Sequence, residues 1–336
     1  MRTINERDIQ AIIARVRSKV GEPSAAPPAP SVRPNAPGGD GIHATVDAAV
    51  AAARKAFLDF RAQGLDARHR VIDGIRTVMR DHARELAEMA HRETGLGRAE
   101  DKVKKNLLVI EKTPGPEDLQ TQTWTGDCGL TLTEPAPFGV IGAITPTTNP
   151  TATIINNTIA GVSAGNAIVF NCHPNAKGVS VHTVRLINSA ITDAGGPPNL
   201  IACVPEPTIE SAQALMNHPG VRVLLVTGGP GVVEEARRTT KRGILAGPGN
   251  PPVVVDETAD LDLAGREIVR GASFDNNLIC TDEKEVFVVA SVADELLASM
   301  VKHGGYLLAE HELAKIDRLI FAEAKHDGTP GKVNPK

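Results

Sequence analysis

The stretch Phe138-Gly-Val-Ile-Gly-Ala-Ile144-Thr-Pro-Thr-Thr-Asn-Pro150 is a short apolar run that ends in a polar loop. A run of this kind, bounded by glycine and proline, predicts a strand buried on both faces. Similar runs follow at residues 167–170, 200–204, 221–226 and 253–255, separated by expected helices near 151–164, 177–194, 209–217 and 232–242. The alternation predicts an α/β fold, in which a mostly parallel sheet has helices on both faces.

The residues on either side extend this pattern. Three helical patterns precede the sheet, around Val46, Val71 and Val103, and a strand is expected at 130–134. From about residue 251 the pattern restarts, with expected helices near 261–271 and from residue 293, and a strand at 285–290. We therefore expect one α/β domain at 41–250 and the start of a second at 251–336.

Composition and charge exclude several classes of function. The chain has 336 residues, 41% of them apolar, and a formal net charge of −4. Because this charge gives no broad electropositive field, nucleic acid is not an expected partner. The four cysteines, Cys128, Cys172, Cys203 and Cys280, lie far apart without C-x-x-C spacing, which indicates neither a zinc site nor a disulfide framework. The apolar runs are too short to span a membrane, so we expect a cytoplasmic protein without a metal.

The first forty residues differ from the rest. Residues 1–20 contain an apolar stripe at helical spacing, which includes Ile9, Ile13 and Val16, and residues 21–40 are rich in proline and alanine. They predict an amphipathic helix on an extended linker. An isolated helix of this length is marginal in water, so its stripe requires a partner. The residues alone leave three partners open: the chain's own body or a sister subunit, a membrane surface, and another protein.

Four motifs follow one another between residues 145 and 284: the loop at 145–150, Val226-Thr-Gly-Gly-Pro230, the acid-free loop Gly243-Ile-Leu-Ala-Gly-Pro-Gly-Asn-Pro-Pro-Val-Val-Val255, and residues 273–284 around Cys280. In this order they resemble the aldehyde dehydrogenase superfamily, specifically its coenzyme-A-acylating branch of microcompartment propionaldehyde and acetaldehyde dehydrogenases. The resemblance implies a Rossmann-type, NAD-binding domain at 41–250, followed by a catalytic domain at 251–336. Relatives continue beyond this point, so we expect a C-terminally short form of an enzyme that is a homo-oligomer when complete.

The resemblance assigns the chemistry to Cys280 and Asn149. A cysteine thiolate can attack an aldehyde and retain the product as a thioester. The side-chain amide of Asn149, with the backbone N–H of Cys280, would stabilise the oxyanion. On the residues alone, Cys280 could also be an inert buried cysteine and Asn149 a residue that caps a loop. Because hydrolysis of a thioester usually needs a carboxylate, the acid-free loop favours coenzyme A as the acyl acceptor.

Cofactor binding is expected at the ends of the strands. A glycine pair between a strand and a helix brings backbone N–H groups close to a pyrophosphate. The expected NAD-binding residues are Thr145, Pro146, Thr147, His173, Thr227, Gly228, Gly229 and Gly247. His173 stands where hydrolytic relatives have lysine, so the choice between NAD and NADP is not readable there, and NAD is the expectation from the acylating branch.

The resemblance therefore implies oxidation of propionaldehyde or acetaldehyde to acyl-CoA with NAD⁺, inside a bacterial microcompartment. It also implies that residues 3–20 dock against a shell protein. Two alternatives remain at this point: a hydrolytic aldehyde dehydrogenase, which the acid-free loop opposes, and a truncated, non-catalytic cargo or scaffold protein.

Overall fold

We describe residues 40–321 from a computed structural model. The helix predicted for residues 1–20 and the linker predicted for 21–40 lie outside this range, apart from Asp40. No described helix is long and apolar enough to cross a membrane.

The centre of the fold is a five-stranded parallel sheet with strand order β5-β4-β3-β6-β7. Its strands are β3 (Val140–Ile144), β4 (Ala167–Asn171), β5 (Ile201–Cys203), β6 (Val221–Thr227) and β7 (Arg242–Ala246). Every residue of β3, β4 and β5 is buried, which is why these segments read as continuous apolar runs. The strand order reverses between β3 and β6. Ligands of such sheets bind outside the carboxyl ends of the strands at this switch point.

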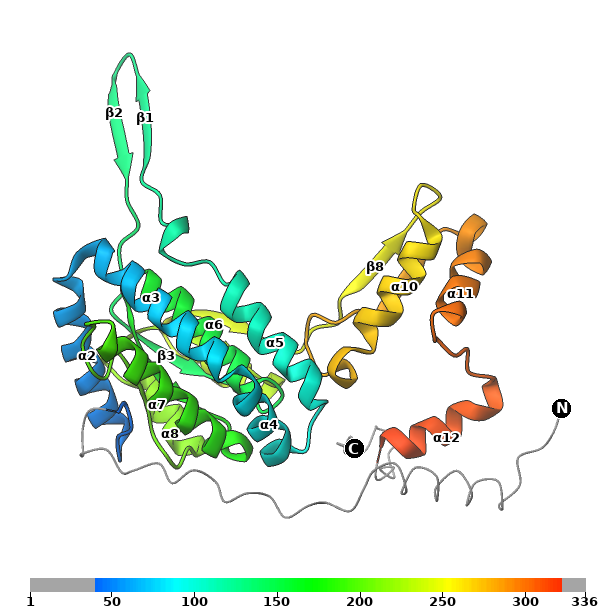
Figure 1. Ribbon diagram of the computed structural model, residues 1–336, viewed down its shortest axis with the longest axis horizontal. Helices are drawn as coiled ribbons and strands as arrows, with labels where there is room; N and C mark the ends of the chain where they lie inside the picture. The colour runs from blue at the N-terminus through cyan, green and yellow to red at the C-terminus, as the bar shows by residue number, and fades with distance from the viewer. Residues whose placement is uncertain (1–39, 322–336) are drawn as a thin grey trace. The chain divides into compact units, whose positions relative to one another are not determined.

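Helices cover both faces of the sheet (Figure 1). On one face lie α6 (Pro150–Ser163) and α7 (Lys177–Asp193), covered in turn by α3 (Gly64–Asp81), α4 (Ala83–Thr94) and α5 (Ala99–Lys112). On the other face lie α2 (Val46–Arg61), α8 (Ile209–Asn217) and α9 (Pro230–Arg237). Short 3₁₀ helices occur at η1 (Pro116–Asp118) and η2 (Pro174–Ala176). One hydrophobic core unites this part of the chain and confirms the predicted α/β class.

A two-stranded antiparallel ribbon precedes the sheet. It consists of β1 (Gln122–Gly126) and β2 (Gly129–Thr133), and every residue of both strands is exposed. Figure 1 shows it extending away from the helices. The strand predicted at 130–134 is β2, and it pairs with β1 instead of entering the parallel sheet.

The last part of the described chain has a small core of its own. Strands β8 (Pro252–Val255) and β9 (Glu285–Val288) pair in parallel, and α10 (Leu261–Ala272) packs against α11 (Ala293–Lys302). The fully enclosed side chains of this core are Val255, Ile268 and Leu296. The remaining elements are η3 (Phe274–Asn277), η4 (Ala290–Val292) and α12 (Glu310–Ile320).

The structure corrects the predicted course of residues 232–255. The helix expected at 232–242 ends at Arg237, and the first part of the predicted loop Gly243–Val255 is strand β7. Strand β7 lies at the edge of the sheet and four of its five residues are exposed. It therefore lacks the buried apolar run by which the other parallel strands are recognised.

Three further elements were not predicted, namely α4, β1 and α12. Helix α4 buries three alanines and one leucine. The ribbon strand β1 and helix α12 bury no residue within the described chain.

Candidate active site

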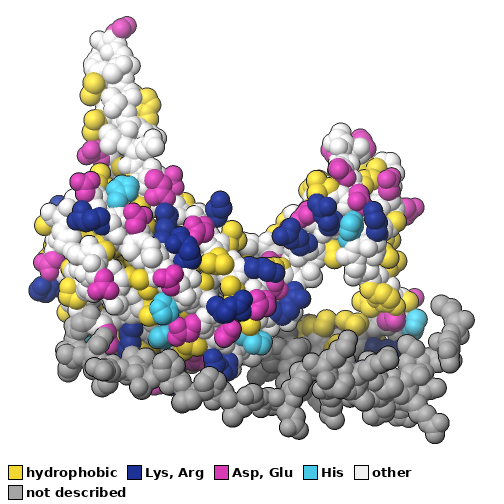
Figure 2. All heavy atoms as spheres, in the orientation of Figure 1, with side chains coloured by type: hydrophobic (Ala, Val, Ile, Leu, Met, Phe, Trp, Pro, Cys, Tyr) yellow, Lys and Arg dark blue, Asp and Glu magenta, His cyan; other side chains and the backbone are white. Residues whose placement is uncertain are grey.

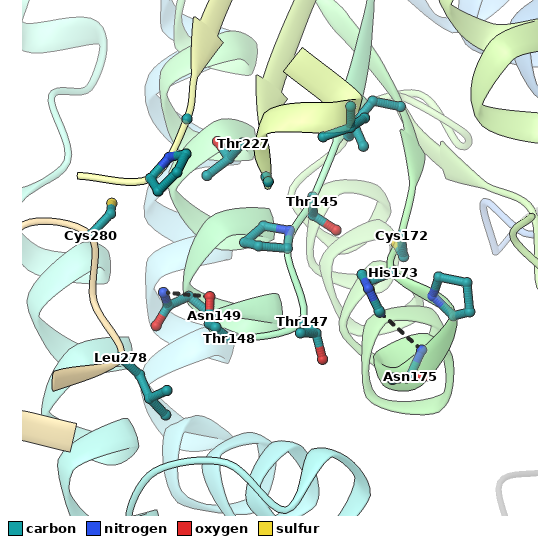
Figure 3. Close-up of a pocket in the computed structure, with 18 of the residues that line it drawn as sticks. Thr145, Thr147, Thr148, Asn149, Cys172, His173, Asn175, Thr227, Leu278 and Cys280 are labelled. Carbon is teal, nitrogen blue, oxygen red and sulfur yellow. Dashed lines mark hydrogen bonds between the residues drawn. The ribbon is translucent and has the colours of Figure 1, made fainter. Parts of the chain in front are cut away.

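A cavity of about 700 Å³ lies at the switch point, where β3 and β6 end (Figure 3). Its walls come from the loops after β3, β4, β6 and β7, and from the loop that contains Cys280. The predicted site residues all line this one cavity: Cys280, Asn149, Thr145, Pro146, Thr147, His173, Thr227, Gly228, Gly229 and Gly247. The structure thus brings them together, and their individual roles remain predictions.

Two helices begin at the cavity. Asn149 is the N-cap of α6 and Gly229 is the N-cap of α9, and no side chain caps either helix. Each helix starts with proline, whose fixed φ suits the first helical position. Uncapped N–H groups and the positive ends of two helix dipoles therefore face the cavity, an arrangement that fits the pyrophosphate of a dinucleotide.

The glycines after β6 and β7 allow the neighbouring loops to approach one another closely. The N–H of Gly228 donates to the carbonyl of Ala246 at 3.1 Å and joins the two loops. A Cβ at Gly229 would meet no atom within 4 Å, so this position is open. A Cβ at Gly249 would lie 2.0 Å from the carbonyl oxygen of Cys280. Gly249 therefore allows the cysteine loop to contact the loop after β7.

His173 lies in the loop after β4, which forms one wall of the cavity. Its Nδ1 accepts a hydrogen bond from the backbone N–H of Asn175 at 3.1 Å. The proton of the neutral ring is therefore on Nε2. Burial lowers the pKa of His173, so the ring is neutral at physiological pH. Cys172, which was not predicted as a site residue, also lines the cavity and is almost fully buried.

The segment before Cys280 has an unusual backbone. Asp275, Asn276 and Asn277 all have positive φ, at 45°, 58° and 57°. Successive non-glycine residues in this region cost on the order of 1–3 kcal/mol each and are concentrated at functional sites. Side chains hold the turn in place, since the Asn277 amide donates to the carbonyls of Ala272 and Glu283 at 2.8 and 3.2 Å.

Asn149 and Cys280 lie on facing sides of the cavity (Figure 3). Cys280 is half-buried. The amide nitrogen of Asn149 donates to Oγ1 of Thr148 at 3.2 Å, and its oxygen accepts from the ammonium of Lys105. Lys102 donates to the carbonyl of Thr148 at 3.1 Å. The loop after β3 is therefore held by two lysines of α5.

Like Cys172, Lys102 and Lys105 were not predicted from the sequence. Lys102 and Lys105 are buried and both contact the fully buried carboxylate of Asp275. No local sequence signal marks them, because Asp275 lies 170 or more positions away. Of the apolar residues that define the predicted face, Val103 and Leu107 are only half-buried and Ile110 is fully buried.

The cavity is poor in charge. Among the described residues that line it there is no aspartate or glutamate, and Lys284 is the one lysine. Within residues 40–321, no cluster of histidine, cysteine and carboxylate side chains could hold a metal ion. The lining can thus offer a thiol, amides, hydroxyls and backbone N–H groups.

Comparison with known proteins identifies the family. The aldehyde dehydrogenase family matches residues 36–314, and the chain belongs to it. The acetylating acetaldehyde dehydrogenase EutE of Salmonella typhimurium is 50% identical over 298 residues, which are 88% of this chain and 62% of that protein. The predicted resemblance is confirmed.

Solved structures agree. The crystal structure of Rhodopseudomonas palustris propionaldehyde dehydrogenase with bound propionyl-CoA has a TM-score of 0.81 and 48% identity, and the match covers 87% of this chain and 64% of that one. A propionaldehyde dehydrogenase from the Clostridium phytofermentans fucose utilisation bacterial microcompartment has a TM-score of 0.80 and 45% identity, covering 88% and 66%. The chain spans less than two thirds of the length of these relatives.

Proposed function

We propose that this protein oxidises a short-chain aldehyde, propionaldehyde or acetaldehyde, to the acyl-CoA with NAD⁺ through a thioester at Cys280. The main observation in support is that one cavity at the switch point contains Cys280, Asn149 and the strand-end loops, without a carboxylate among its described lining residues. In this proposal residues 41–250 bind the dinucleotide and residues 251–336 supply the nucleophile. The similarity to acylating dehydrogenases supports the same reaction class.

In the first step, Sγ of Cys280 as the thiolate bonds to the aldehyde carbon, and the carbonyl oxygen becomes an oxyanion. The Nδ2 of Asn149 and the backbone N–H of Cys280 donate to this oxyanion. As the oxyanion collapses, the C=O bond re-forms, the former aldehyde C–H bond breaks with loss of hydride, and a thioester is left on Cys280. The dinucleotide, when bound, supplies the hydride acceptor, and coenzyme A supplies the thiol that receives the acyl group.

The loops orient the dinucleotide. Backbone N–H groups at Gly229 and the starts of α6 and α9 would hold its phosphates, and Gly228, whose N–H is bonded to Ala246, would let the chain approach them closely. Thr145, Pro146, Thr147, His173 and Gly247 line the same cavity and would provide the other contacts to the dinucleotide.

The cavity favours transfer to a thiol over hydrolysis. A positioned general base contributes about 10²–10⁴-fold to such reactions. Without a carboxylate in the described lining, water attacks the thioester without this assistance. The thiol of coenzyme A forms a thiolate, which is a strong nucleophile near neutral pH. Its attack therefore depends less on a general base than the attack of water does.

The test is to measure NADH formation from propionaldehyde with and without coenzyme A, and to identify the product by mass spectrometry. We expect acyl-CoA as the main product. Cys280→Ala should abolish turnover and the thioester adduct and leave NAD⁺ binding near normal. Cys128→Ala, which changes an exposed cysteine, is the matched control. Mainly free acid at saturating coenzyme A would replace this proposal with the hydrolytic function, and absence of any NADH would favour a non-catalytic role.

We further propose that the protein acts in a bacterial microcompartment and that residues 3–20 bind a shell protein. Ile9, Ile13 and Val16 support this through their helical spacing ahead of a Pro- and Ala-rich segment. A microcompartment relative of solved structure supports the location. Deletion of residues 1–20 should keep enzymatic activity and remove co-purification with shell proteins. Unchanged co-purification would contradict this assignment.

We also propose self-association through the β1–β2 ribbon. Trp124, Leu130 and Leu132 are 55%, 67% and 56% exposed on it. Figure 2 shows hydrophobic side chains along the ribbon, and exposed apolar surface of this kind favours association. Trp124→Ser with Leu132→Ser should shift the mass measured by light scattering toward the monomer. An unchanged mass would rule out the ribbon as the interface.

A further inference from the structure

Two lysines and one aspartate lie buried behind the cavity wall that contains Asn149. Lys102 and Lys105 are 2% and 6% exposed, and both ammonium groups contact Oδ2 of Asp275, which is 0% exposed. None of the three lines the cavity. Two buried ammonium groups beside one carboxylate leave an excess of positive charge, which is unfavourable for stability. The contacts of the cluster therefore indicate its function.

The carboxylate of Asp275 is fixed from several directions. Its Oδ1 accepts from the backbone N–H of Arg98 at 2.7 Å, and its own backbone N–H donates to Asp101 at 3.1 Å. Gly97 has a φ of 66°, and a Cβ there would lie 2.0 Å from Oδ1 of Asp275. The start of α5 is therefore shaped around this carboxylate, which provides a rigid anchor for the two lysines.

Lys105 connects the anchor to Asn149. An ammonium group can only donate hydrogen bonds, so it pairs with Oδ1 of the carboxamide and not with Nδ2. This pairing determines which way the carboxamide faces. One hydrogen of Nδ2 goes to Thr148 at 3.2 Å, which leaves the other for the cavity. Figure 3 shows this nitrogen on the side of Asn149 that faces Cys280.

We propose that Lys105 is a positioning residue, which holds the carboxamide of Asn149 so that Nδ2 donates to the oxyanion formed at Cys280. Asp275 holds Lys105, and Lys102 fixes the same loop through the carbonyl of Thr148 at 3.1 Å. This inference rests on the proposed function, because the oxyanion role of Asn149 is part of it. A reversed carboxamide would direct a lone pair at the oxyanion and repel it.

The charge state of Lys105 is compatible with this role. Burial and the neighbouring Lys102 lower its pKa to about 8, against the opposing effect of Asp275. The group is thus mainly an ammonium at neutral pH, the form that cannot accept a hydrogen bond from Nδ2.

The test uses p-nitrophenyl acetate, which acylates a reactive cysteine without dinucleotide or coenzyme A. Sγ of Cys280 bonds to the acetyl carbon, an oxyanion forms, and p-nitrophenolate leaves with the electron pair of the broken C–O bond. The initial burst of p-nitrophenolate therefore reports on oxyanion stabilisation. The variants are Lys105→Met, Asn149→Ala and the double variant. Lys112→Met, an exposed lysine of the same helix, is the control.

We expect Asn149→Ala to lower the burst rate by about 10²-fold, as found when an oxyanion donor is removed, and Lys105→Met to lower it at least about 10-fold. The double variant should be no slower than Asn149→Ala alone, because Lys105 acts through Asn149. Lys112→Met should match the parent. Lys105→Gln, which keeps a donor without the charge, should recover part of the rate.

Three outcomes overturn the proposal: an unchanged burst in Lys105→Met, multiplicative losses in the double variant, or a parent burst that does not depend on Asn149. Absence of NADH formation with a normal, Lys105-dependent burst would contradict only the proposed dehydrogenase function. Far-UV circular dichroism checks each fold, and where Lys105→Met is unfolded, Lys105→Leu, which also lacks a donor, takes its place in the cycle with the same criteria.

Discussion

Raising the pH should stabilise this protein through Lys105. Its pKa is lowered from 10.5 to about 8 in the folded chain, first by burial and then by Lys102. One pKa unit corresponds to about 1.4 kcal/mol, so keeping this group charged in the fold costs about 3 kcal/mol at neutral pH. Lys105 is 6% exposed, so solvent screens little of this cost.

The direction follows from proton binding. Between pH 8 and 10.5 the unfolded chain still binds a proton at Lys105 that the folded chain has released, so a rise in pH favours the folded state. The cost is fully present below the folded pKa of about 8 and is lost as the pH approaches the unfolded value of 10.5. Lys105→Met has no such group and should lack this component.

The assay is urea unfolding of the parent and of Lys105→Met at pH 7, 8.5 and 10, followed by circular dichroism. The free energy of unfolding of the parent, relative to the variant, should increase by about 2–3 kcal/mol from pH 7 to pH 10. Lys112→Met, with an exposed lysine, should show no such change. A constant difference between parent and Lys105→Met, or one that falls with pH, would refute the reasoning.

Three substitutions test other parts of the fold. Gly97→Ala puts a Cβ 2.0 Å from Oδ1 of Asp275 at a φ of 66°. It should lower the urea midpoint of unfolding by the equivalent of about 1–3 kcal/mol. An unchanged midpoint would show that α5 can adapt. Gly249→Ala puts a Cβ 2.0 Å from the carbonyl of Cys280 and should slow its acylation by p-nitrophenyl acetate, whereas an equal rate would show that the loop moves freely. Ile75→Ala, at a fully buried site, should cost about 2–5 kcal/mol in the same unfolding experiment, and a loss below about 1 kcal/mol would mean that the core collapses around the gap.

The parallel sheet was predictable because helices cover it. Strands buried on both faces are mostly apolar, and every residue of β3, β4 and β5 is apolar except Asn171 at the end of β4. Strand β7 was missed because four of its five residues are exposed, so it has no continuous buried apolar run. Helix α4 was missed although the residues of its buried face, Ala83, Leu86, Ala87 and Ala90, recur at helical spacing.

The cavity residues were predictable for a topological reason. Residues that follow parallel strands meet at one edge of the sheet, so Thr145, His173 and Thr227 had to lie near one another. Lys102 and Lys105 were not predictable in this way. Buried lysines are rare, so helical periodicity alone points to the apolar residues beside them as the inward face. Their ion pairs with Asp275 join residues 173 and 170 positions apart, and no local pattern contains such a contact.

The hydrophobic cores on the two sides of the cavity differ in size, so the two walls differ in local stability. Backbone amides in β3 and β6 lie inside the large core, so their hydrogens exchange with solvent only when the whole sheet unfolds. Those in β8 and β9 are covered by a core of three enclosed side chains, and a small two-stranded sheet of this kind opens at low free-energy cost. Cys280 lies between η3 and β9. Within the described chain, the dinucleotide side of the cavity should therefore exchange its backbone amide hydrogens more slowly than the cysteine side.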